Sequence, residues 1–261
     1  MPDRPTYPQA TTAAELQANF QAVQAKINAA CARAGRSPDQ VRLLPVSKTV
    51  SAERLRLAVG LGYTRFGENK IQEAQAKWQA MSGLPVKWSV IGHLQSNKIK
   101  YLVKFADEFQ ALDNTKTAEL LNEKLRQANR SLDVLIQINT SGEESKYGLH
   151  PEQAAAFIRD IARFDRLNIR GLMTLALLSD NTAQVRGCFT LLRQLRDQLR
   201  PNLPDHMRMD ELSMGMSGDF ETAIEEGATI VRIGQALFGA RNLPDSHYWP
   251  EQTTAEDPQQ P

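Results

Sequence analysis

The chain has 261 residues, of which 41% are hydrophobic and 23% are charged, as is usual for a globular protein. With 31 basic against 30 acidic side chains it lacks the basic excess that neutralises a phosphate backbone, which argues against nucleic acid as the main partner. Two cysteines are too few for a disulfide framework, and the longest apolar stretch, 172–178, is too short to cross a bilayer. We therefore expect a cytoplasmic protein that is not bound to a membrane.

Proline-rich segments at both ends predict the domain limits. Residues 1–11 contain three prolines, and residues 243–261 contain four among polar side chains. Such segments bury too little apolar surface to offset the entropy lost on ordering. We predict a flexible N-terminal tail over 1–11, a single domain over 12–242 and a C-terminal tail over 243–261.

The first predicted element is a helix over 14–34, where apolar residues from Leu16 to Ile27 recur three or four positions apart and Gly35 ends the repeat. Beyond it, short apolar runs alternate with segments of helical period. The apolar runs predict strands over 41–46, 64–66, 86–91, 108–112, 132–138, 169–175, 211–213 and 228–232. The segments between them predict helices over 53–59, 69–81, 96–105, 116–129, 151–164, 184–199 and 220–226.

Strands that alternate with helices form parallel βαβ units. Eight predicted strands match a (β/α)8 barrel in number and in length of chain. The alternative is a doubly wound open sheet, but no Gly-x-Gly-x-x-Gly motif follows the first predicted strand. The predicted fold is therefore α/β, a single TIM barrel with an extra N-terminal helix.

The first predicted strand leads into Lys48, at the end of a barrel strand where functional groups of this fold lie. Because side chains alternate along a strand, Leu44, Val46 and Lys48 share a face, and Lys48 continues an apolar row that points inward. One interpretation is an ordinary lysine that leaves the strand into solvent. The other is a desolvated amine with a lowered pKa, which forms an imine with an aldehyde.

Polar residues follow three other predicted strands. Asn69 follows the second strand, where it either caps the next helix or presents its amide to a ligand. His93 belongs to a polar run after the third strand and is either a structural histidine or part of the barrel mouth. Lys146 lies in the segment 139–148 after the fifth strand, which is either a binding loop or a solvated one.

The turns after the last two predicted strands have the composition of an anion site. Ser213, Met214 and Ser217 belong to a segment rich in serine and glycine, 212–219, that precedes a helix, and Gly234 and Gln235 follow the eighth strand. Backbone N–H groups in such turns bind anions, and barrels often hold phosphate after strands seven and eight.

An imine-forming lysine and a phosphate cradle on one barrel require a phosphorylated aldehyde, for which pyridoxal 5′-phosphate is the obvious candidate. Arg232 then lies where the ring nitrogen of this cofactor would sit. Enzymes that use the cofactor as a strong electron sink place a carboxylate there, whereas an arginine leaves the nitrogen unprotonated and disfavours carbanion chemistry. An imine-forming aldolase that acts on a phosphosugar is an alternative from the same lysine and cradle.

Four segments together resemble the YggS/PROSC family of pyridoxal phosphate homeostasis proteins, whose barrel is similar to that of alanine racemase. The resemblance covers about residues 14–242 and rests on motifs at 46–48, 67–69, 91–98 and 212–239. It implies a barrel of fold type III that holds pyridoxal phosphate as a covalent imine on Lys48.

The resemblance also implies roles for individual residues. By analogy with alanine racemase, Ser213 and the backbone of Gly234 and Gln235 hold the phosphate, and Arg232 faces the ring nitrogen. Lys146 occupies the place of an arginine near the phenolic oxygen and is a candidate for a second, transient lysine partner. The predicted cofactor-binding set is Lys48, Asn69, Lys146, Ser213, Met214, Ser217, Arg232, Gly234 and Gln235.

The resemblance implies a protein that carries, buffers or delivers pyridoxal phosphate without catalysis, and so affects amino-acid and keto-acid balance. Alanine racemase has a second, β-rich domain and takes one of its two bases from the partner subunit, and too little sequence follows residue 242 for such a domain. A weak racemase or other amino-acid enzyme is the alternative. We expect a monomer without a metal ion, whose candidate partners are apo enzymes that use the cofactor and regulatory proteins.

Overall fold

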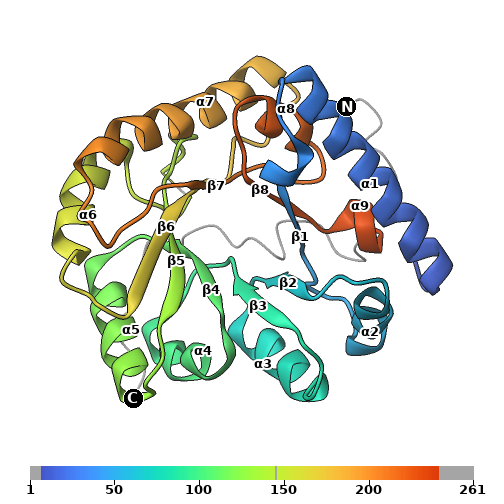
Figure 1. Ribbon diagram of the computed structural model, residues 1–261, viewed down its shortest axis with the longest axis horizontal. Helices are drawn as coiled ribbons and strands as arrows, with labels where there is room; N and C mark the ends of the chain where they lie inside the picture. The colour runs from blue at the N-terminus through green and yellow to red at the C-terminus, as the bar shows by residue number, and fades with distance from the viewer. Residues whose placement is uncertain (1–6, 145, 241–261) are drawn as a thin grey trace, which may run out of the picture.

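Strands and helices alternate along the chain, and the helices lie outside the strands (Figure 1). The structure, a computed structural model, describes residues 7–144 and 146–240. Its strands are β1 (Arg42–Pro45), β2 (Arg65–Glu68), β3 (Lys87–Val90), β4 (Glu108–Leu112), β5 (Leu132–Gln137), β6 (Leu167–Met173), β7 (Glu211–Ser213) and β8 (Ile230–Ile233). Its α-helices are α1 (Ala13–Arg33), α2 (Ala52–Gly60), α3 (Ile71–Ala80), α4 (Ile99–Phe105), α5 (Thr115–Gln127), α6 (Ala154–Ile161), α7 (Thr182–Leu199), α8 (Phe220–Glu225) and α9 (Gln235–Phe238).

The strands form one parallel sheet in the order β1-β8-β7-β6-β5-β4-β3-β2. The two ends of this order meet at a bridge between Val46 and Gly67, where the Ser47 N–H donates to the Gly67 carbonyl at 2.9 Å. The bridge closes the sheet on itself almost completely. The predicted (β/α)8 barrel is confirmed, and the doubly wound open sheet is excluded.

The predicted N-terminal helix, α1, completes the ring of helices. Thr12 and Glu15 form a capping box that starts it. The helix that follows β8, α9, has only 4 residues, and α1 packs against α8, α9 and α2 (Figure 1). Phe20 of α1 stacks on Tyr63 with ring centroids 3.7 Å apart. Among the described residues, no helix is long and apolar enough to cross a membrane.

Large apolar side chains fill the space around the strands. Trp88 of β3, Phe66 of β2 and Phe109 of β4 are at most 1% exposed, and the rings of Phe66 and Trp88 lie 6.1 Å apart. Burial of each such side chain contributes about 1.5–3 kcal/mol to folding. This core holds the strands in place, so that the residues after each strand project from a rigid frame.

The predicted elements agree with the structure except at their ends. The strands over 108–112 and 211–213 have the predicted bounds. The helices predicted over 96–105 and 151–164 each begin as a 3₁₀ turn, at Ser96–Lys98 and Pro151–Gln153, before the α-helix starts. Such terminal turns are common because 3₁₀ bonds satisfy the first backbone groups of a helix.

The structure differs from the predicted N-terminal tail in residues 7–10. The Tyr7 carbonyl accepts a hydrogen bond from the Ala240 N–H at 2.7 Å, and the Ala10 N–H donates to the Phe238 carbonyl at 3.4 Å. Arg54 Nε donates to the Ala10 carbonyl at 2.9 Å. These partners lie far away in the sequence, so composition does not reveal them. Residues 1–6 and the predicted tail 243–261 lie outside the described residues.

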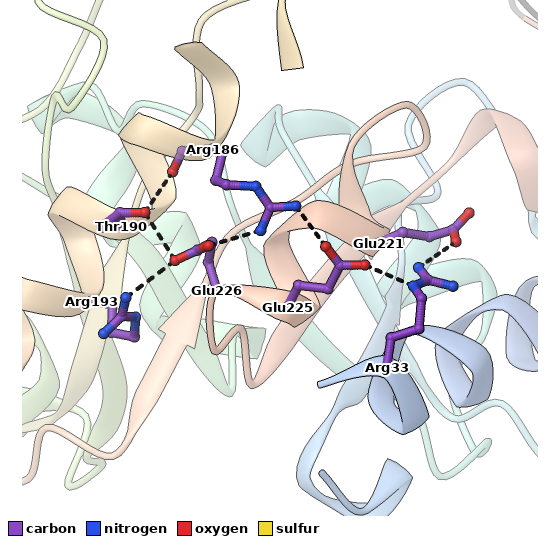
Figure 2. A network of polar contacts seen from close by, with 7 residues as sticks. All are labelled: Arg33, Arg186, Thr190, Arg193, Glu221, Glu225 and Glu226. Carbon is purple, nitrogen blue, oxygen red and sulfur yellow. Dashed lines mark hydrogen bonds and ion pairs between the residues drawn. The ribbon is translucent and has the colours of Figure 1, made fainter. Parts of the chain in front are cut away.

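A network of charged side chains ties α1 and α7 to α8 (Figure 2). Its members are Arg33, Arg186, Thr190, Arg193, Glu221, Glu225 and Glu226. Glu226, directly after α8, accepts hydrogen bonds from Arg186 at 2.8 Å, Thr190 at 2.9 Å and Arg193 at 3.2 Å. Its side chain is 13% exposed, whereas the Glu221 side chain, which pairs with Arg33, is 39% exposed. The network therefore centres on Glu226 rather than on the outer pair.

Glu226→Ala should lower the free energy of unfolding by about 1–3 kcal/mol, because three donors lose a half-buried charged acceptor. Glu221→Ala, which removes one exposed pair, should cost less than about 0.5 kcal/mol. Urea denaturation of both variants measures the difference. Equal losses would show that the network adds nothing beyond ordinary surface pairs.

Candidate functional site

The carboxyl ends of the strands lie at one end of the barrel because the strands are parallel. Lys48 follows β1 at this end and is 4% exposed. The interpretation of Lys48 as an ordinary solvent-facing lysine is therefore wrong. Its burial agrees with the inward direction that strand alternation predicts.

One pocket at this end brings together three of the predicted site residues, Lys48, Gly234 and Gln235. Arg54 of α2, which the sequence analysis did not single out, lines the same pocket and donates a hydrogen bond to the Phe238 carbonyl at the end of α9. Burial lowers the pKa of Arg54 from its usual value. The pocket thus combines an amine, a guanidinium and the backbone at the start of α9.

Arg232 lies on β8, the strand that pairs with β1, at the register position of Leu44. It is 3% exposed, and its two terminal nitrogens donate to Ser213 Oγ and to the Thr174 carbonyl, each at 2.8 Å. Burial lowers the pKa of Arg232 to about 10, while the Asp219 carboxylate acts in the opposite direction. The guanidinium is therefore still positively charged at neutral pH.

Ser213 connects Arg232 to a chain of polar groups inside the barrel. Ser213 Oγ donates to Gln110 Oε1 at 2.6 Å, and Gln110 Nε2 donates to Glu108 Oε2 at 2.7 Å. Because β4 and β7 are not neighbours in the sheet, the bond between Gln110 and Ser213 crosses the barrel interior. The Ser213 hydroxyl therefore contacts Arg232 and Gln110, and the contact with phosphate that the resemblance implies for it stays a prediction.

The turn after β7 contains two further predicted residues, Met214 and Ser217, which differ in burial. Met214 is fully buried, whereas Ser217 is half-buried and its Oγ accepts a hydrogen bond from the Ala236 N–H of α9 at 3.5 Å. Gly215 has a φ of 93°, and a Cβ at this position would lie 2.6 Å from Ala223 Cβ. A glycine is thus needed for the turn to pack on α8, and Ser217 joins the turn to α9.

Asn69 does not cap α3, which begins at Ile71 with Lys70 in the cap position. The Asn69 Oδ1 atom is buried and has no hydrogen-bond partner among the described residues. Gly92 lies against Asn69, because a Cβ at Gly92 would be 2.4 Å from the Asn69 carbonyl oxygen. The capping interpretation is wrong, and the buried amide oxygen is left for a bound molecule or water to satisfy.

Two loops at the mouth contact each other through aromatic rings. His93, after β3, stacks on Tyr147, after β5, with ring centroids 4.1 Å apart and an interplanar angle of 17°. Lys146 forms an ion pair with Glu143 of the same loop and donates to the Ala176 carbonyl at 3.2 Å. Among the described residues, Lys146 is not part of the lining of the Lys48 pocket.

A buried ionic cluster that was not predicted from the sequence lies beside the end of β1. Lys77 of α3 is 7% exposed, and its Nζ donates to the Ser47 carbonyl at 2.6 Å, Glu68 at 2.7 Å and Glu73 at 2.6 Å. Burial raises the pKa of Glu68 to about 7, although Lys77 acts in the opposite direction. Two signals point to the cluster: Glu73 and Lys77 are four residues apart on one helix, and Lys77 follows the buried Ala74 by three positions.

The fold and the residues at its mouth define a barrel domain of the alanine racemase type. The family model for the N-terminal domain of alanine racemase matches residues 18–242. Among individual relatives, the pyridoxal phosphate homeostasis protein of Haemophilus influenzae is 41% identical over 233 residues, which are 88% of this chain and 98% of that protein. The chain belongs to the YggS/PROSC family, which confirms the resemblance that its motifs indicate.

Two further similarities agree with this family. The pyridoxal phosphate homeostasis protein of Aquifex aeolicus is 41% identical over 216 residues, which are 83% of this chain and 94% of that protein. The structure of PipY from Synechococcus elongatus with pyridoxal phosphate bound has a TM-score of 0.75 at 32% identity and covers 87% of this chain and 100% of PipY.

Glu68→Gln should remove a pH-dependent part of the stability. Because the pKa of Glu68 rises from 4.5 in the unfolded chain to about 7 on folding, the folded state holds an extra proton between these values. The free energy of unfolding therefore falls as pH rises through this window, by at most about 1.4 kcal/mol per pH unit. Urea denaturation at pH values in this window should show a steeper fall for the wild type than for Glu68→Gln. Parallel pH profiles would exclude this role of Glu68.

Proposed function

We propose that this protein binds pyridoxal 5′-phosphate and serves the intracellular homeostasis of that cofactor, as a carrier or buffer that delivers it. The observation that carries the proposal is the burial of Lys48, which is 4% exposed and shares a pocket with Gly234 and Gln235. A buried amine that shares a pocket with a cation and with the backbone of Gly234 and Gln235 suits a phosphorylated aldehyde. The names of the relatives and the cofactor in PipY support the same ligand.

Lys48 provides the amine for a covalent link in this proposal. The cofactor supplies an aldehyde, and its condensation with an amine forms a carbon–nitrogen double bond and releases one water molecule. Lys48, which follows β1 and is 4% exposed, would hold the cofactor away from bulk water. Asn69, directly after the neighbouring strand β2, offers a buried amide oxygen that has no hydrogen-bond partner in the described part of the chain.

The proposed phosphate site lies between the turn after β7 and the start of α9. Ser217, which already accepts from the Ala236 N–H, and the backbone of Gly234 and Gln235 are the proposed contacts. Arg54 adds a positive charge to the same pocket, which favours a dianionic group. Met214 supports this turn from the core.

Arg232 is proposed to face the ring nitrogen, with Ser213 orienting its guanidinium. A positive charge at this place disfavours protonation of the ring, and an unprotonated ring stabilises a carbanion poorly. The hydrogen bonds from Arg232 to Ser213 and to the Thr174 carbonyl, each 2.8 Å long, restrict the guanidinium to one orientation. We therefore infer that the protein holds its cofactor without turning over amino acids.

Delivery requires that the cofactor leave Lys48. Lys146, whose role the family resemblance implies, is the proposed transient partner and would supply a second amine to which the cofactor could pass. Its present partners, Glu143 and the Ala176 carbonyl, hold it in the loop after β5. The proposed setting is the cytoplasm, with a monomer that passes the cofactor to apo enzymes or contacts regulatory proteins.

Lys48→Ala should abolish the covalent link. Wild-type protein mixed with pyridoxal phosphate should show a visible absorption band that borohydride bleaches, and mass spectrometry should locate the reduced adduct on Lys48. Lys116→Ala, which removes an exposed lysine at the start of α5, is the matched control and should keep both signals. A wild-type protein that stays colourless and binds no added cofactor would remove the proposal, and an adduct in Lys48→Ala would assign the link to another lysine.

Solvent deuterium tests the absence of turnover. With pyridoxal phosphate bound, the wild type should exchange the Cα proton of amino acids no faster than the free cofactor does in buffer. Arg232→Gln should exchange faster, because loss of the neighbouring cation favours protonation of the ring nitrogen. Proton NMR in deuterated buffer measures both rates. Rapid exchange by the wild type would favour a racemase-like enzyme over a carrier.

A further inference from the structure

Charged side chains hold the backbone on both sides of Lys48. On one side, Lys77 Nζ donates to the Ser47 carbonyl at 2.6 Å. On the other side, the Thr49 N–H donates to Glu73 Oε1 at 2.6 Å. Lys77 and Glu73 are themselves an ion pair at 2.6 Å on α3. A single ion pair of α3 thus contacts the residues before and after the buried lysine.

Thr49 has a backbone conformation that few residues with a side chain adopt. Its φ is 68°, and it is one of the two non-glycine residues with positive φ in the described chain, the other being Asn129. Such residues keep this conformation only where their surroundings impose it, and they concentrate at functional sites. The Thr49 N–H itself donates to Glu73, and the Val50 N–H donates to the Ser47 carbonyl at 2.9 Å, so a side-chain bond and a turn bond together restrain this conformation.

Lys77 serves as a fixed cation and not as a second amine nucleophile. Its three donors meet three acceptors, the Ser47 carbonyl, Glu68 and Glu73. An ammonium group has three N–H donors and no lone pair, so an amine that donates three hydrogen bonds has nothing left with which to attack an aldehyde. Lys77 therefore supports the turn around Lys48 and does not compete with it.

The cluster lies where the barrel closes. β1 and β2 meet at the bridge between Val46 and Gly67, one residue before Ser47 and one residue before Glu68. Ser47 Oγ donates to Glu68 Oε1 at 2.6 Å, so the serine joins both strands through its side chain as well as its backbone. Side-chain contacts thus add to the backbone bridge at the point where the chain leaves β1 toward Lys48.

We propose that Glu73 and Lys77 are positioning residues for Lys48, which hold its backbone so that the amine meets the aldehyde of a bound cofactor in the orientation for condensation. The inference rests on the proposed function, because it concerns the same lysine and the same ligand. Misplacement of a reacting group by about 1 Å slows a reaction by up to about a hundredfold. The cluster accordingly acts on the rate of the covalent step more than on the affinity of the non-covalent complex.

Glu73→Ala and Glu73→Gln test the proposal as a pair. Both variants lose the charge, but glutamine keeps an oxygen that accepts the Thr49 N–H, whereas alanine does not. Gln72→Ala, which changes the neighbouring exposed residue of α3, is the matched control. Stopped-flow absorbance at increasing concentrations of pyridoxal phosphate separates the limiting rate constant of band formation from the half-saturating concentration. Hydrogen exchange of the segment containing Thr49 is measured without cofactor, and circular dichroism checks that each variant is folded.

Glu73→Ala should lower the limiting rate constant by about tenfold to a hundredfold with little change in half-saturation. Exchange at Thr49 should become faster in Glu73→Ala, and Glu73→Gln should recover most of both properties. A wild type that forms no adduct on Lys48 would overturn the proposed function and this inference together. A normal wild type with an unchanged rate constant in folded Glu73→Ala would overturn this inference alone, and so would an equal loss in Gln72→Ala.

Discussion

Closure of the sheet between β1 and β2 is the contact on which the site depends. The two strands share a backbone bridge at Val46 and Gly67, and a buried ammonium group, that of Lys77, joins the end of β1 to Glu68 of β2. A buried charge is tolerated only when its hydrogen-bonding groups are satisfied. Loss of Lys77 or of Glu68 would therefore leave the other side chain buried without its partner, which costs several kcal/mol at most. The end of β1, and with it Lys48, is therefore held by the same contacts that close the barrel.

A second buried polar system supports Arg232 on β8, the strand next to β1. Arg232 reaches Ser213, and the chain continues through Gln110 to Glu108 across the barrel interior. A hydrogen-bonded chain of this kind restricts the guanidinium, because a rotation would break its bonds to Ser213 and to the Thr174 carbonyl. Lys48, which follows β1, and Arg232 of the neighbouring strand β8 are thus held by different sets of contacts.

Much of the fold was predictable because its signals are local. Apolar runs and helical periods follow from residues a few positions apart, and the strands over 108–112 and 211–213 have the predicted bounds. The grouping of Lys48 with Gly234 and Gln235 was predictable as well, since parallel strands bring their carboxyl ends to one edge. The contact of residues 7–10 with α9 was not predictable. A proline-rich composition indicates that a segment gains little from folding, but it does not show which distant residues that segment contacts.

The sequence by itself determined the class of fold, the family and the strand ends at which polar residues gather, since all three follow from short-range patterns. Only the tertiary structure decided what each polar group contacts. In the folded chain Ser213 contacts Arg232 and Gln110, and Asn69 does not cap α3. Ser47, Glu68, Glu73 and Lys77 form one cluster. The physical reason is that a buried polar atom is satisfied by partners from other strands and helices, and only the folded chain brings these together.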